Sequence, residues 1–143
     1  MKRLTLTIIA ICICLVLKAQ YNNGINIGSL LKTDTTSIGQ KIIYPNFQND
    51  EATISGITIP PGSSTSQHKH NFPVFAYVLK ENLTKEIENH KTKQFTEGSS
   101  FAEVLNTFHN GTNKGNEDVV LIAFYMGEKG KALYVHKEIN NEK

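Results

Sequence analysis

The sequence predicts an all-β protein with a single domain. Its 143 residues are enough for one domain with a buried core. Short runs of β-branched, aromatic and alternating residues, separated by turn signals, recur through most of the chain, as in a sandwich or barrel. Beyond the first 19 residues no long amphipathic helical pattern occurs. Hydrophobic residues make up 39% and charged residues 20% of the chain, which excludes a disordered tail and a multispan membrane protein.

The expected strands follow an irregular lead-in. Residues 20–37 are rich in Asn, Gly, Thr and Ser and show no strong period, apart from a short turn expected at 29–31. The apolar run 119–126 also suits a helix by its periodicity, but its β-branched and aromatic content and the following Gly127 favour a central strand. The expected domain covers residues 38–136, and a polar tail follows at 137–143. The strands are expected at residues 40–44, 52–59, 75–79, 83–87, 91–95, 100–104, 119–126 and 132–136.

The first 19 residues have the pattern of a bacterial signal peptide. Lys2 and Arg3 give a basic start, and the apolar stretch 4–17 is shorter than the roughly 20 residues of a membrane-spanning helix. Ala19 places a small residue before a cleavage site at Gln20. The alternative is an apolar helix buried in the core. Cleavage predicts a periplasmic or secreted protein without further membrane association.

The composition of the processed chain excludes several kinds of site. Both cysteines, Cys12 and Cys14, lie in the leader, so the processed chain has no disulfide, no thiolate nucleophile and no sulfur ligand for a metal. The leader also holds three of the 15 basic residues, including Arg3, the only arginine, and none of the 13 acidic residues. The rest is close to neutral, so nucleic acid is not an expected partner.

Catalytic motifs built on other chemistry are also missing from the sequence. It has no G-x-S-x-G elbow for a serine nucleophile and no glycine-rich loop with phosphate-binding spacing. The remaining classes are metal chemistry with nitrogen and oxygen ligands, and simple ligand binding.

Two histidines form the first half of a candidate metal site. On a strand, His68 and His70 point to the same face while Lys69 points away. Alone this pair is weak evidence, because two ordinary polar strand residues have the same pattern. The surrounding spacing adds to it. Five residues separate Gly62 from His68, and further on ten residues separate Gly98 from His109 and three separate His109 from Asn113.

With these spacings the chain resembles the cupin superfamily, whose two motifs read G-x5-H-x-H-x3/4-E-x6-G and G-x5-P-x-G-x2-H-x3-N. The resemblance covers about residues 60–127 and includes the run Tyr77-Val78-Leu79-Lys80-Glu81, which is similar to the segment that follows the first motif. It implies a double-stranded β-helix, or jelly-roll barrel, over 38–136. The matching positions are Gly62, His68 and His70 in the first motif and Gly98, His109 and Asn113 in the second.

The chain departs from the cupin motifs at the metal-binding glutamate. Spacing places that glutamate at Val74 or Phe75, neither of which binds a metal. The resemblance therefore implies a metal site of three histidines, His68, His70 and His109. Nitrogen ligands suit divalent iron, manganese, nickel, copper or zinc. Without a carboxylate to offset the charge of the ion, we expect an anionic ligand to be favoured at the open positions.

Two side chains are candidates for proton transfer beside this metal. If Phe101 faces the barrel interior, Glu103 does too. Glu103 would then be a fourth ligand, a hydrogen-bond acceptor for an imidazole, or a general base; the alternative is a solvent-facing charge at a strand end. Tyr77 alternates with Phe75 and would line the cavity with a hydroxyl, or else is an ordinary core tyrosine.

Three further polar residues have structural interpretations. We expect Asn113 to fix the loop after His109 through backbone hydrogen bonds. His90 is expected in a solvated hairpin turn and His136 at a strand end.

Two functions of different classes follow from the sequence. The first is a periplasmic or secreted metal-binding cupin, which the resemblance implies to be a dioxygenase-like or isomerase-like enzyme acting on a small organic molecule. The second is a non-catalytic barrel that binds a small molecule or a metal as a sensor or scavenger. A barrel without any ligand is the third interpretation. A homodimer is compatible with all three, because an exposed sheet edge needs covering.

Overall fold

The computed structural model describes residues 24–138 of the chain. The expected signal peptide, its cleavage site at Gln20 and the last five residues lie outside the described residues. Within 24–138 the chain forms nine β-strands and no helix, so the all-β prediction is confirmed. The same residues accordingly include no helix of the length and apolarity that crossing a bilayer requires.

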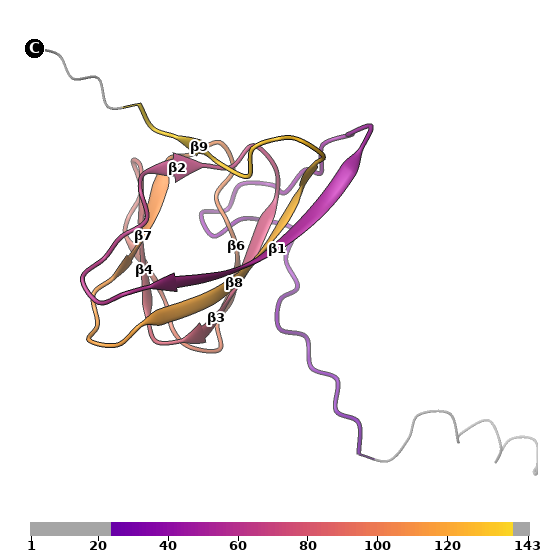
Figure 1. Cartoon of the computed structure of the whole chain (residues 1–143). Coiled ribbons are helices and arrows are strands. Elements are labelled where there is room, and N and C mark those ends of the chain that lie inside the picture. The colour runs from indigo at the N-terminus through magenta and orange to yellow at the C-terminus, as the bar shows by residue number, and fades with distance from the viewer. Residues whose placement is uncertain (1–23, 139–143) are drawn as a thin grey trace, which may run out of the picture.

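The strands form two antiparallel sheets that face each other (Figure 1). One sheet has the strand order β1-β8-β3-β6 and the other has the order β5-β4-β7-β2-β9. The chain passes repeatedly from one sheet to the other, so the two sheets enclose a common interior. The strands are β1 Asp50–Ile59, β2 His68–Lys69, β3 Val74–Lys80, β4 Leu83–Ile87, β5 Lys93–Phe95, β6 Ser100–Ala102, β7 His109–Asn113, β8 Val119–Glu128 and β9 Val135–His136.

The apolar run after residue 118 is a central strand, as the sequence predicts. β8 lies between β1 and β3 and pairs with both. Its buried residues alternate with half-buried ones, as expected where one face covers the core. Together with the inward-facing residues of β1 and β3, the inward face of β8 forms the hydrophobic core. The inward residues of β8 are Val119, Leu121, Ala123, Tyr125 and Gly127.

The lead-in differs from the expectation of a strand at 40–44. Lys41 makes only an isolated bridge with Thr35, and Ile43 and Tyr44 are exposed, so these residues join neither sheet. Gln40 instead fastens the lead-in to the barrel. Its side-chain amide donates to the Leu105 carbonyl at 2.9 Å and accepts from the Leu105 N–H at 2.9 Å.

Two strands that carry the site have little strand signal of their own. β2 is two residues long, and β7 reads His-Asn-Gly-Thr-Asn, in which Asn and Gly are depleted in strands. β7 is a strand because β4 pairs with it along its whole length, from Leu83 opposite Asn113 to Ile87 opposite His109. Tertiary pairing, rather than local preference, determines this half of the barrel.

One glycine of β8 is required by packing. A Cβ atom at Gly127 would lie 3.0 Å from Cζ of Phe72, an aromatic ring that is itself buried. We expect Gly127→Ala to lower the free energy of unfolding by about 1–3 kcal/mol through overpacking, measured by urea denaturation. Gly56→Ala on β1 is the matched control, because no heavy atom lies within 4 Å of its Cβ position. Equal losses in both variants would contradict this explanation.

Candidate metal centre

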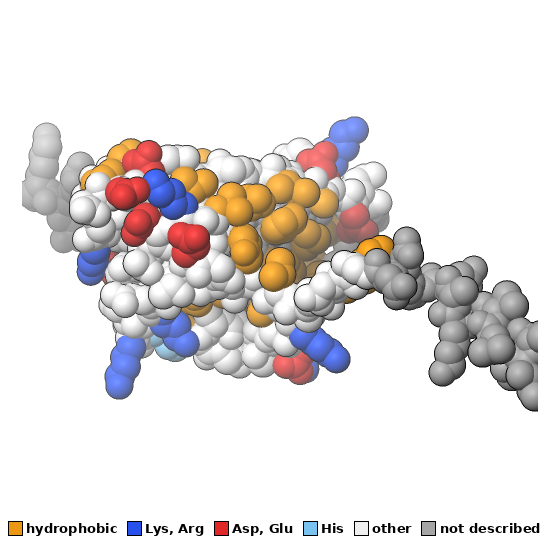
Figure 2. All heavy atoms as spheres, turned by 90° about the horizontal axis from the view of Figure 1, so that it is seen from below, with side chains coloured by type: hydrophobic (Ala, Val, Ile, Leu, Met, Phe, Trp, Pro, Cys, Tyr) orange, Lys and Arg blue, Asp and Glu red, His pale blue; other side chains and the backbone are white. Residues whose placement is uncertain are grey.

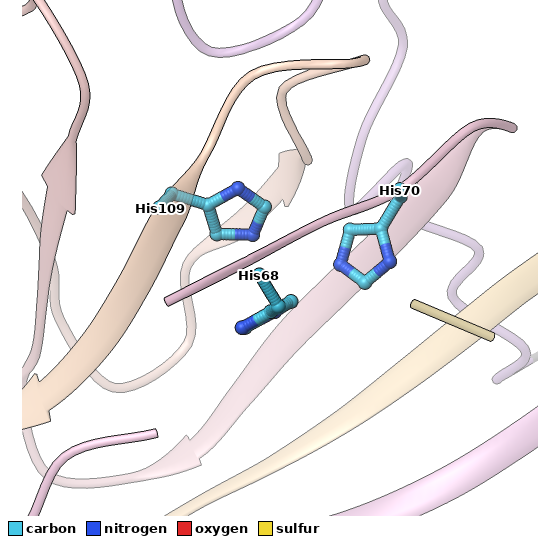
Figure 3. A group of neighbouring side chains, drawn as sticks. All are labelled: His68, His70 and His109. Carbon is cyan, nitrogen blue, oxygen red and sulfur yellow. The ribbon is translucent and has the colours of Figure 1, made fainter. Parts of the chain in front are cut away.

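The register of the five-stranded sheet brings three histidines to one point. His68 of β2 lies directly opposite His109 of β7, so both side chains project from the same face. His70 follows two residues after His68 and bridges to Leu105, which keeps it on that face as well. Figure 3 shows the three rings grouped around a common space. Their centroids are separated by 4.5 to 5.2 Å.

Each imidazole is held by a backbone carbonyl on its Nδ1 side. The distances from Nδ1 are 2.7 Å to the Ser66 oxygen for His68, 2.9 Å to the Leu133 oxygen for His70, and 3.0 Å to the Thr107 oxygen for His109. A carbonyl oxygen only accepts, so Nδ1 must carry the proton in each ring. The lone pair of each neutral ring is then on Nε2, which is the arrangement found in metal-binding histidines.

Burial keeps these rings neutral. It lowers the pKa of all three histidines, and backbone hydrogen bonds only partly offset it for His68 and His70. For His109, burial and the positive charge of Lys85 lower the pKa to about 3. Neutral imidazole is the form that binds a metal, so the site needs little deprotonation at neutral pH.

The geometry fits a divalent metal ion. One ligand atom from each of His68, His70 and His109 lies within 4.8 Å of the other two. Metal–nitrogen bonds of about 2.0–2.1 Å place two ligands at most about 4 Å apart, so a small inward rotation of the rings completes the set. Nε2 of His109 is buried and has no hydrogen-bond partner. A buried polar atom without a partner is costly, and a metal ion would satisfy it.

A buried ion pair lies next to the histidines. Lys85 of β4 pairs with Oε2 of Glu103, and both side chains are almost fully buried, with 2% and 10% exposed. The same oxygen lies 3.6 Å from Nε2 of His109. Burial alone would raise the pKa of Glu103, but the charge of Lys85 and the nearby imidazoles lower it to about 2. Glu103 therefore faces the interior as an ionised group, and the alternative of a solvent-facing charge is wrong.

His68 lies between a small chamber, which His70 also lines, and a larger cleft. The chamber has a volume of about 50 Å³, and Lys85, Glu103 and Val74 are in its wall. The cleft has a volume of about 490 Å³ and opens on the other side of His68. The two spaces adjoin each other and share four lining residues: Ile57, Thr65, His68 and Tyr125. The rest of the cleft wall consists of Ser55, Ser66, Leu133, Tyr134 and His136.

The placement of Tyr77 corrects the expectation from the sequence. Val74, Ala76 and Val78 are the buried residues of β3, so Tyr77 projects from the opposite, outer face. It lines an apolar groove there with the lead-in residue Leu30, far from the interior, and hydrophobic side chains gather on that side of the molecule (Figure 2). Neither a cavity-lining hydroxyl nor an ordinary core tyrosine describes Tyr77, and we assign it no role at the histidines.

Tyr125 takes the position that the sequence analysis gave to Tyr77. It is 7% exposed, its ring packs edge-on against His70 at 5.7 Å, and it lines both chamber and cleft. Burial, followed by the negative charge of Glu103, raises its pKa, so its hydroxyl is protonated at neutral pH. The sequence carries no signal for this placement, because residues 119–126 are all apolar or aromatic and alternation cannot tell the two faces of β8 apart.

The other polar candidates lie where the sequence placed them. Asn113 is buried and its Nδ2 donates to the carbonyls of Ile59 and Glu117 at 2.8 and 2.7 Å, which ties the β7–β8 loop to the end of β1. His90 lies exposed in the turn between β4 and β5. His136 ends β9 opposite His68, and its Nδ1 is 3.0 Å from Oγ of Ser66. His136 thus forms part of the cleft rim.

Comparison with known proteins shows similarity at the level of structure. No protein-family model matches the sequence, and no curated protein matches it. A protein with a double-stranded β-helix domain from Klebsiella pneumoniae is 15% identical over 84% of this chain and 90% of that one, with a TM-score of 0.53. A cupin-like protein from Thermotoga maritima is 14% identical over 60% of this chain and 64% of that one, with a TM-score of 0.54.

A third similar structure is an enzyme. The DMSP lyase DddQ from Ruegeria pomeroyi is 14% identical over 60% of this chain and 43% of that one, with a TM-score of 0.53. This chain therefore spans less than two thirds of the length of the lyase and of the Thermotoga protein. At these identities the likeness shows the fold alone, which is the double-stranded β-helix.

Proposed function

We propose that the chain is a member of the cupin superfamily, which its fold and its histidine spacing support, and that it binds one divalent transition metal ion through His68, His70 and His109. The observation that carries the proposal is the common hydrogen bonding of the three rings. The Nδ1–H group of each ring donates a hydrogen bond to a backbone carbonyl, so the three Nε2 atoms remain as ligands. Iron, manganese, nickel, copper and zinc all accept such a donor set.

The surroundings of the histidines suit a small organic ligand. A bound divalent ion would supply Lewis acidity and an attraction for negative oxygen, and three protein ligands leave coordination positions open. The chamber of about 50 Å³ has room for one small donor group, and the cleft of about 490 Å³ has room for the body of the molecule. Lys, Arg, Asp and Glu are not among the cleft residues, so the body of the ligand is uncharged.

The aromatic cleft wall favours a planar or apolar ligand body. Tyr125, Tyr134 and His136 present rings to the cleft, while Ser55 and Ser66 present hydroxyls for a few hydrogen bonds. An anionic donor group entering the chamber would meet the imidazoles and an ion pair whose charges cancel. The proposed ligand is thus a small molecule with one negatively charged oxygen donor and an uncharged body.

Both an enzyme and a binding protein are compatible with this site. The enzyme would be a dioxygenase-like or isomerase-like cupin, in which the hydroxyl of Tyr125 is placed to hold a proton at the junction of chamber and cleft. The alternative is a sensor or scavenger that binds the metal or small molecule without turnover. Oxygen uptake and product analysis of the metal-loaded protein with phenols and diketones separate the two. The leader pattern of residues 1–19 supports a periplasmic or secreted location.

Metal binding is tested directly by titration. We expect the full chain to bind one Zn²⁺ or Co²⁺ per molecule and to gain thermal stability as it does so. Calorimetry at pH 6 in buffers of different ionisation enthalpy counts the protons released. Three histidines with an ordinary pKa near 6.5 would release about two protons per ion. Because burial lowers the pKa of these three, we expect fewer.

Two results would contradict the proposal. One is that the chain binds neither Zn²⁺ nor Co²⁺ and that its melting temperature does not change when either ion is added. The other is binding that releases about two protons per ion, as histidines with an ordinary pKa would. The ion would then be held elsewhere on the chain.

A further inference from the structure

Glu103 places a carboxylate in the chamber wall, next to the segment where the cupin motif has a glutamate and this sequence does not. The spacing of the cupin motif puts a glutamate at Val74 or Phe75, and Val74 lines the chamber. The backbone N–H of Glu103 donates to the Val74 carbonyl at 2.8 Å, so the two residues are neighbours across adjacent segments. Glu103 lines the same chamber. The carboxylate thus comes to this wall from the segment after β6 instead of from β3.

The carboxylate of Glu103 is almost within the coordination sphere that the histidines would form. Its Oε2 atom is 3.6 Å from Nε2 of His109. Two ligands of one ion with bonds of about 2.0–2.2 Å lie about 3–4 Å apart. A rotation of the Glu103 side chain would therefore suffice to add an oxygen ligand to the three nitrogens.

The carboxylate of Glu103 is instead paired with Lys85. The ammonium group pairs with the same Oε2 atom, and its side chain is 2% exposed. It projects inward from β4 and also lies over the ring of Phe101, 5.4 Å from its centroid. Lys85 has no other acidic partner among the described residues, so a move of Glu103 to a metal ion would leave a buried ammonium unpaired beside a divalent cation. Both the lost pairing and the repulsion oppose that move.

We propose that Lys85 holds Glu103 out of the metal coordination sphere and so keeps the site a three-histidine site with open positions. This inference rests on the proposed metal binding. It assigns Lys85 a positioning role: the lysine determines how many protein ligands the ion has, and therefore how many positions remain for an external ligand. With the pair intact, the only charge in the chamber left to attract an anion is that of the ion itself.

Cobalt spectroscopy of the full chain and three variants tests this role. The absorption of Co²⁺ changes with the number and kind of its ligands, independently of any activity. In Glu103→Gln we expect the cobalt spectrum of the unaltered protein, because Glu103 is not a ligand. In Lys85→Met we expect a changed spectrum and an affinity for Co²⁺ about tenfold higher or more, because the freed carboxylate binds the ion. The double variant Lys85→Met/Glu103→Gln should return to the original spectrum.

The outcomes separate this inference from the metal proposal. No cobalt binding by the unaltered chain overturns the proposed function itself. Cobalt binding with the same spectrum and affinity in Lys85→Met overturns the role of Lys85 alone. A spectrum in Glu103→Gln that shows the loss of an oxygen ligand also overturns it, because Glu103 would already be bound. If Lys85→Met does not fold without metal, Lys85→Gln replaces it, since its amide still donates to Glu103 but carries no charge.

Discussion

The His109→Ala variant is expected to bind Zn²⁺ and Co²⁺ at least about 100-fold more weakly than the unaltered chain. Altering residues that merely support metal ligands already costs about 10–100-fold in affinity, and this change removes a ligand outright. His109 is fully buried and its Nε2 atom has no hydrogen-bond partner, and the nearby carboxylate of Glu103 is paired with Lys85, so we expect no neighbouring group to take its place. Calorimetric titration with each ion, together with the shift of the melting temperature on metal addition, measures the effect.

Two comparisons make this result specific. His68→Ala should lose affinity to a similar degree, and its half-buried side chain makes folding less sensitive to the change. His90→Ala and His136→Ala remove histidines that lie outside the cluster and should keep the affinity of the unaltered chain. Metal affinity that survives in His109→Ala, in a variant whose circular dichroism shows an intact β-fold, would place the ion elsewhere.

One half of the histidine cluster could be predicted from strand geometry alone. Two residues at positions i and i+2 share a face on any strand, which applies to His68 and His70. The arrival of His109 opposite His68 is different. β7 has almost no strand signal, so only the motif spacing of the cupin resemblance linked the two segments. The hydrogen bonds of these rings to backbone carbonyls could not be predicted from the spacing. For His68 and His109 the carbonyl is two positions away in the sequence, and for His70 it is 63 positions away.

The error at Tyr77 also has a physical cause. Every residue from Val74 to Leu79 is apolar or aromatic, so alternation cannot tell the inner face of β3 from the outer face. The outer face is apolar too, and together with Leu30 and Leu31 of the lead-in it lines the groove. One other inward residue, Lys85, carried a readable signal. Lys85 stands between Leu83 and Ile87 on one face of β4, and a charge on an apolar stripe indicates a buried partner.

The metal-free protein is expected to lose stability as the pH falls from 7 to 4. Burial and Lys85 lower the pKa of His109 to about 3, and burial lowers the pKa of His68 and His70 as well. Below about pH 6.5 the unfolded chain therefore takes up protons that the folded chain does not, and this favours unfolding. The stability is complete above that pH and is lost progressively towards pH 3, by an amount on the order of 4 kcal/mol for His109 alone.

Glu103 acts in the same direction at lower pH. Its pKa is lowered from 4.5 to about 2, so the stability that it contributes is present above about pH 4.5 and disappears as the pH falls through 2. The histidines should therefore account for the loss between pH 6.5 and 4.5, and the carboxylate should add to it only below that range. Because a domain is stable by only about 5–15 kcal/mol, the two effects together should unfold the metal-free protein once the pH falls below about 4.5.

Urea denaturation at pH 7, 6, 5 and 4 in the presence of a chelator measures this dependence. His109→Gln removes the ring with the most strongly lowered pKa, so its midpoint should fall less between pH 7 and 5 than that of the unaltered chain. His90→Gln, which removes an exposed ring in a turn, should keep the full fall. Midpoints that stay level from pH 7 to 5 would mean that the three rings are not held neutral by burial. Neutral rings are what makes the cluster ready to bind a metal, so that result would also remove the main electrostatic support for the site.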